Sequence, residues 1–323
     1  MQRVIQDTMN EPPQEKEPIS SRETISNSQT SLKEWGVLGA SLLFYLLFWQ
    51  AALRIPILHP FYLDTLTLCS LAMVLFITVW FARTLKYPIW IGVSLTLSLL
   101  ITLPGVLIPM LSSNLPPTLI PMIGRIYYLY RDIFRTLPGL QGLLLIWVAV
   151  SLGAALARLI RETKMLLPIA IVLALVDLYV VFGGGLVAQA NSGKAPAAQR
   201  AMASLTVPLT PKIRTAKGVI SPPPLAVGFA DFLFTALFFA CFARFQIPAR
   251  KTFYWLCGTL CLYLLAVRIF TVDLPALVPI AAVVIGRNRR LFQYTPQERR
   301  DLLIAGLVVA IAMGAALFIS KRR

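Results

Sequence analysis

The sequence predicts an all-α fold, a polytopic transmembrane helical bundle of about nine helices. Hydrophobic residues make up 57% of the 323 residues, and the mean hydropathy is +0.73. Several apolar runs have the length of roughly 20 residues that a helix needs to cross the core of a bilayer. Short basic or proline-rich breaks separate these runs, which do not alternate with the period of two typical of membrane barrel strands. We therefore expect an integral, multi-pass membrane protein.

The predicted elements begin with a polar tail. Residues 1–34 are rich in Glu, Ser, Gln and Pro and carry no apolar periodicity, so we expect them to be disordered. Nine apolar spans follow, at 36–53, 66–82, 89–111, 140–160, 165–187, 225–245, 253–270, 274–286 and 302–320. The first four form an N-terminal group of transmembrane helices within 35–160. The next four lie within 161–290, the half that carries the candidate site, and residues 291–323 predict an extra C-terminal helix.

Two segments interrupt the spans. Residues 112–135 combine three prolines with three arginines and predict an interfacial or re-entrant segment. Residues 188–224 are polar, basic and rich in Pro and Ser, and they predict one long internal loop. The seventh and eighth spans are nearly continuous. Pro275 marks the break between them, because proline lacks a backbone N–H and disfavours helix at the preceding residue.

The composition excludes several classes of function. The net charge is +16, but Lys and Arg gather at the ends of apolar runs, where they orient helices against anionic lipid. We therefore predict contact with a lipid bilayer and no nucleic-acid partner. The four cysteines lie in apolar runs, which argues against a disulfide framework. The single histidine, His59, cannot supply the histidine pair of a zinc protease, so no metal or cofactor is expected.

Two acids, Asp177 and Asp231, lie inside the apolar runs MLLPIAIVLALVDLYVVFGGGL and LAVGFADFLFTALFFACF. A carboxylate at the middle of a bilayer costs at least about 2.5 kcal/mol, so two of them in neighbouring spans indicate a function that needs both. The spans are consecutive and antiparallel. A rise of about 1.5 Å per residue places the two carboxylates at depths of roughly 14 and 9 Å from the same membrane surface. We therefore expect them to meet.

Paired carboxylates predict a particular chemistry. Two such groups in one site cannot both ionise cheaply, so they share a proton and titrate as a pair. One can act as a base on a water molecule while the other donates a hydrogen bond to the carbonyl under attack. This is aspartic-protease chemistry, in which Asp177 and Asp231 are the catalytic residues and water is the nucleophile.

Three motifs resemble a known family. The run Asp177-Leu-Tyr-Val-Val-Phe-Gly183 is similar to the first aspartate helix of presenilin and signal peptide peptidase. The run Gly228-Phe-Ala-Asp231 is similar to their GxGD helix, and Pro275-Ala-Leu277 matches their PAL motif in the correct order. The resemblance covers about residues 165–290 and is closer to signal peptide peptidase.

The resemblance implies a presenilin-like bundle and an intramembrane aspartyl endopeptidase. Its substrates would be transmembrane peptides, either helices of membrane proteins or signal peptides, and Asp177 and Asp231 would be its catalytic pair. The residues that it places at the substrate are Gly228, Pro275, Ala276 and Leu277. Two positions depart from the family pattern, because Val176 replaces a tyrosine and Ala230 replaces the second glycine of GxGD.

Two alternatives stay open. A proton-coupled membrane transporter could use the aspartate pair as a relay, although this class predicts internal repeats with matching broken helices. A catalytically weak family member could bind membrane helices as a scaffold, which Val176 and Ala230 would favour.

Overall fold

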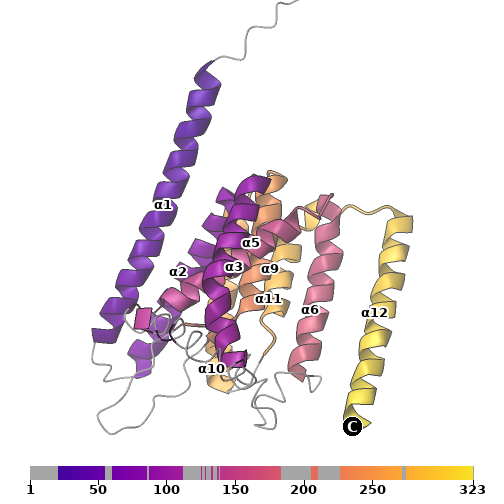
Figure 1. Ribbon diagram of the computed structural model, residues 1–323. Helices are drawn as coiled ribbons and strands as arrows, with labels where there is room; N and C mark the ends of the chain where they lie inside the picture. Colours follow the sequence, from indigo (N-terminus) through magenta and orange to yellow (C-terminus); the bar gives the residue numbers. More distant parts are fainter. Residues whose placement is uncertain are drawn as a thin grey trace, which may run out of the picture.

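The computed structural model describes residues 21–54, 60–85, 87–111, 139–182, 205–209, 226–270 and 274–322, with residues 125, 128, 132, 133 and 137 between them. The described residues are mostly helical and form nine α-helices (Figure 1). These are α1 (Ser21–Arg54), α2 (Pro60–Thr84), α3 (Pro88–Leu111), α5 (Leu140–Ala157), α6 (Leu166–Phe182), α9 (Phe229–Arg244), α10 (Arg250–Phe270), α11 (Leu277–Arg287) and α12 (Pro296–Arg322). Short 3-10 helices, η1 (Thr163–Met165) and η2 (Arg289–Leu291), precede α6 and follow α11.

Each predicted apolar span corresponds to one of these helices, so the helical class and the number of helices are confirmed for the described residues. Five of the described helices are long and apolar enough to cross a membrane. The candidate spanning segments are Lys33–Ala52, Asp64–Thr84, Leu140–Ala157, Thr163–Phe182, which includes η1 ahead of α6, and Arg250–Phe270. The break around Pro275 is also present, because α10 ends at Phe270 and α11 begins at Leu277.

Helix α1 begins earlier than expected. Residues 21–34, predicted to belong to a disordered tail, are helical, and Figure 1 shows α1 extending past the upper end of the bundle. No proline or glycine occurs between residues 19 and 35, so nothing in this stretch breaks a helix. A helix that has formed in an apolar span extends more easily than a new one nucleates. Residues 1–20 of the predicted tail lie outside the described residues.

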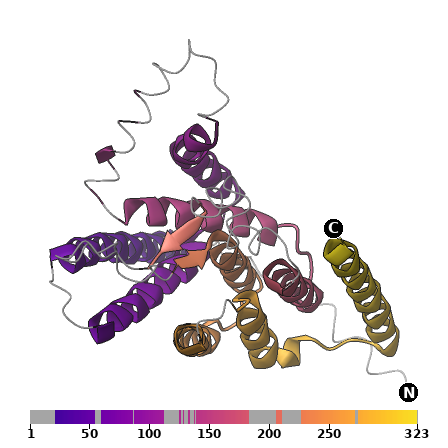
Figure 2. The ribbon, with the colours of Figure 1, turned by 90° about the horizontal axis from the view of Figure 1, so that it is seen from below.

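A small β-sheet departs from the all-α prediction. Strands β1 (Thr206–Pro208) and β2 (Ala226–Gly228) are antiparallel, with Val207 opposite Val227. The sheet lies at the lower end of the bundle, the end seen in Figure 2. The predicted loop 188–224 therefore contains a strand that pairs with the residues just before α9. The rest of this loop and most of residues 112–135 lie outside the described residues.

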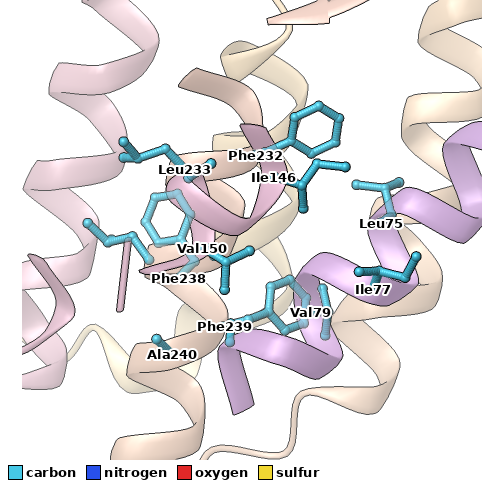
Figure 3. Packing of buried hydrophobic residues seen from close by; sticks show 14 of the residues in the cluster. Leu75, Ile77, Val79, Ile146, Val150, Phe232, Leu233, Phe238, Phe239 and Ala240 are labelled. Atoms are coloured by element: carbon cyan, nitrogen blue, oxygen red, sulfur yellow. The ribbon is translucent and has the colours of Figure 1, made fainter. Parts of the chain in front are cut away.

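The core lies where α2, α5 and α9 meet. Figure 3 shows side chains from all three helices packed together, including Ile77 on α2, Ile146 on α5 and Phe239 on α9. Arg244 joins the upper ends of α5 and α9, because its Nη1 donates hydrogen bonds to the carbonyl of the last residue of α5 and to carbonyls just after it. The distances are 2.9 Å to Ala157 and 2.7 Å to Ile160. No N–H of the helix donates to these carbonyls, so the guanidinium supplies the hydrogen-bond donors that they lack.

Gly153 sets the close approach of α5 to α9. A Cβ atom at this position would lie 2.5 Å from the carbonyl oxygen of Leu233 and 2.9 Å from the amide nitrogen of Leu237. We expect Gly153→Ala to lower the free energy of unfolding by about 1–3 kcal/mol, because the backbones must move apart. Gly258→Ala on α10 is the matched control, because the added Cβ meets no atom within 4 Å. Unfolding in detergent micelles measures both, and equal stabilities of the two variants would contradict this account.

The extra C-terminal helix is present and lies beside α6 (Figure 1). Thr295 and Glu298 cap its first turn, with the Thr295 N–H 2.7 Å from Glu298 Oε2 and the Glu298 N–H 3.3 Å from Thr295 Oγ1. The Thr295 N–H and then Lys164 lower the pKa of Glu298. The ammonium of Lys164 lies 3.0 Å from Glu298, and the hydroxyl of Tyr294 donates to the Lys164 carbonyl at 2.5 Å. These contacts join the start of α12 to the start of α6.

Candidate functional site

Three helix ends meet at the lower end of the bundle. Asp177 lies five residues before the end of α6 at Phe182, and Asp231 is the third residue of α9. Helix α11 begins at Leu277 and packs against both α6 and α9. The predicted depth of Asp231 is corrected, since the helix begins at Phe229 and not at residue 225. Asp231 therefore lies in the first turn of its helix, where residues 226–228 pair as a strand instead.

Asp177 contacts the segment that the PAL resemblance singles out. Its Oδ2 accepts a hydrogen bond of 2.8 Å from the backbone N–H of Leu277. This N–H belongs to the first turn of α11, where amides have no acceptor within the helix. The positive end of the helix also favours a carboxylate there. Asp177 therefore caps a helix that begins 100 residues later in the chain, and Pro275, Ala276 and Leu277 lie beside it.

Asp231 caps its own helix. Its Oδ2 accepts a hydrogen bond of 3.2 Å from the N–H of Gly228, the residue that ends β2 and precedes α9. A Cβ at position 228 would lie 3.3 Å from this oxygen, so glycine permits the backbone to approach the carboxylate closely. Asp177 and Asp231 thus lie at ends of α6 and α9, two helices that pack against α11. That the two carboxylates meet stays a prediction.

A small cavity adjoins Asp231. Its volume is about 20 Å³, which is room for about one water molecule. The polar residues that line it are Asp231, Thr235 and Tyr263, and Ala276, which lies between α10 and α11, lines it as well. Asp177 does not line this cavity and lies instead where α6 meets Leu277. The cavity is far too small to hold a peptide.

Thr235 is a candidate site residue that the sequence analysis missed. Its side chain is 1% exposed, and its Oγ1 has no hydrogen-bond partner among the described residues. Threonines within other helices bond to the carbonyl one turn earlier, as Thr78 does to Val74 and Thr96 to Gly92. Thr235 lines the same cavity as Asp231. The spacing of four residues from Asp231 was the available signal, because it places both on one helix face.

Tyr263 is a second missed residue. Its hydroxyl donates a hydrogen bond to the carbonyl of Leu274, just before Pro275. This contact holds the non-helical residues 274–276 against the side of α10. No sequence signal points to it, because the contact depends on how the chain folds back after α10.

No family model matches the chain, and no curated protein or solved structure matches it either. Among the residues that the structure describes, no group of three or more His, Cys, Asp or Glu side chains could hold a metal ion. The groups that the described site brings to one end of the bundle are two carboxylates, the side chains of Thr235 and Tyr263, and the non-helical residues 274–276.

Proposed function

We propose that this chain is a multi-pass integral membrane protein with a presenilin-like bundle, and that it hydrolyses peptide bonds within transmembrane segments. Its substrates would be helices of membrane proteins or signal peptides. The observation that supports the proposal best is the meeting of three separate chain segments. The 2.8 Å hydrogen bond joins Asp177 to Leu277, while Asp231 and Ala276 line one cavity. Residues from three predicted motifs thus gather at one end of the bundle.

The reaction uses the two carboxyl groups and one water molecule. With one proton shared by the pair, the ionised carboxylate removes a proton from water as its oxygen attacks the peptide carbonyl. The protonated partner donates a hydrogen bond to the carbonyl oxygen, which becomes a hydroxyl of the tetrahedral intermediate. The intermediate then collapses, the C–N bond breaks, and the leaving amine takes a proton from the pair.

The non-helical residues 274–276 offer hydrogen-bond partners to the backbone of an unwound substrate. A transmembrane helix keeps its peptide bonds in internal hydrogen bonds and must unwind before hydrolysis. Unwound backbone in lipid needs new partners, which an extended segment or a sheet edge supplies by strand pairing. Both lie at this site, because residues 274–276 are not helical and β2 ends at Gly228, beside Asp231. Val176 and Phe182 of α6 are exposed apolar side chains that a substrate helix could meet from the lipid.

The proposal is tested with the purified full chain and a labelled transmembrane peptide in lipid vesicles. We expect cleavage inside the apolar stretch of the peptide, and no cleavage by Asp231→Ala. Peptide binding without any product would favour the scaffold alternative. Flux of a solute that depends on a proton gradient, again without peptide product, would favour the transporter alternative.

Thr235 gives a more specific prediction about this site. We expect Thr235→Val to lower kcat about threefold to tenfold, the effect of losing one hydrogen bond to a water molecule held beside Asp231. Thr235→Ser keeps the hydroxyl and should restore most of the activity. The measurement is kcat and KM for the labelled peptide, together with the unfolding midpoint. Equal loss in both variants would mean that the methyl group matters and the hydroxyl does not.

A further inference from the structure

A cavity at the opposite end of the bundle concentrates positive charge. Its volume is about 510 Å³, and it lies between the turn that joins α9 to α10 and the C-terminal end of α11. Four basic residues line it, and no acidic residue of the described chain does. They are Lys251, Arg287, Arg289 and Arg290. We propose that this cavity binds the phosphate group of an anionic phospholipid.

The four basic side chains are exposed and lack a carboxylate partner in the described chain. The described ion pairs join Lys164 to Glu298 and Arg268 to Asp64, and neither involves the cavity. Guanidinium groups bind phosphate oxygens through paired hydrogen bonds, and Lys adds a compact positive charge. Four positive charges around one cavity repel each other. A phosphate bound there reduces this repulsion, so its binding is favoured electrostatically.

Stabilisation of a helix end does not account for these charges. Basic residues often lie at helix C-termini, where they interact with the last carbonyls. Here Asn288 already caps α11, with its Nδ2 donating to the carbonyl of Val284 at 2.9 Å and to Thr252 Oγ1 at 3.3 Å. Asn288 and Thr252 are both buried and join α11 to the start of α10. The surrounding basic side chains therefore remain available to a ligand.

Aromatic residues indicate that this cavity lies at the depth of lipid headgroups. Tyr254 and Trp255, in the turn after Lys251, are 59% and 63% exposed, and such residues gather at membrane interfaces. The guanidinium of Arg250 lies 5.9 Å from the centre of the Tyr254 ring. At this depth the abundant phosphate belongs to lipid, and the inference does not depend on the aspartate site at the other end.

The test compares two variants of the purified full chain that lose the same charge. Arg289→Gln/Arg290→Gln removes two lining residues, whereas Arg299→Gln/Arg300→Gln removes two exposed arginines of α12 outside the cavity. Native mass spectrometry measures binding of phosphatidylglycerol, with phosphatidylcholine and inorganic phosphate as separate ligands. We expect the cavity variant to bind phosphatidylglycerol about tenfold more weakly and the α12 variant to bind it within about twofold of the unmodified chain.

Three outcomes would overturn the proposal. Equal losses in the two variants would mean that only net charge matters, and no loss in the cavity variant would exclude the cavity. Inorganic phosphate that competes fully at millimolar concentration would assign the cavity to a soluble anion. The unfolding midpoint without lipid checks that both variants fold. If the cavity pair fails to fold, Lys251→Gln replaces it and should weaken binding severalfold.

Discussion

Replacing either aspartate of the pair by asparagine should abolish peptide cleavage. An amide can neither take a proton from water nor share one with its partner, so we expect cleavage by Asp177→Asn or Asp231→Asn to fall by at least about a hundredfold. Folding should change little. The amide oxygen can still accept the hydrogen bonds that the carboxylates now receive from Leu277 and Gly228. Initial rates with the labelled transmembrane peptide, beside unfolding midpoints, measure both effects.

Asp64→Asn is the matched control for this experiment. Asp64 lies near the start of α2 and pairs with Arg268 at 3.3 Å, near the end of α10. The same chemical change is therefore made to an acid whose partner is a guanidinium and not a second carboxylate. We expect near-normal cleavage, because partly exposed ion pairs contribute little to stability. A dyad variant that cleaves as fast as Asp64→Asn would remove the basis for the proposed function.

The helices could be predicted from the sequence because their signal is local. An apolar run of sufficient length has one stable solution in a bilayer, so nine runs gave nine helices in the described chain. The positions at which the helices begin were less predictable. Residues 21–34 continue α1 although they are polar, and residues 226–228 leave the predicted span to pair with Thr206–Pro208. Both outcomes depend on what adjoins the segment and not on its own composition.

Site residues that are unusual in a membrane helix could be predicted from the sequence, whereas residues that are common there could not. A carboxylate stands out in an apolar run, so Asp177 and Asp231 were found at once. Pro275 stood out because it interrupts a helix. Thr235 did not stand out, because the hydroxyl of a threonine in a membrane helix usually donates to a backbone carbonyl one turn earlier in the same helix. Tyr263 carries no local signal, because its partner Leu274 is recognised only in the folded chain.

Replacing Pro275 by alanine should remove most of the cleavage activity. Proline at this position supplies no N–H and disfavours helix at Leu274, so no helical turn ahead of Leu277 offers a carbonyl to its N–H. Alanine allows α11 to extend backward, and the N–H of Leu277 would then bond to a carbonyl four residues earlier and leave Asp177. We expect a loss of about tenfold or more in kcat/KM, while stability falls by no more than about 1 kcal/mol.

Pro88→Ala tests whether this effect belongs to position 275. Pro88 is the first residue of α3, where the missing N–H would have no acceptor within the helix. The same substitution there leaves residues 274–277 unchanged, so cleavage should stay near normal. If Pro275→Ala also cleaved normally while both aspartates remained essential, residues 275–277 would be an ordinary helix start that happens to adjoin Asp177. Loss in Pro275→Ala alone would instead tie catalysis to the non-helical stretch, because only that variant frees Asp177 from Leu277.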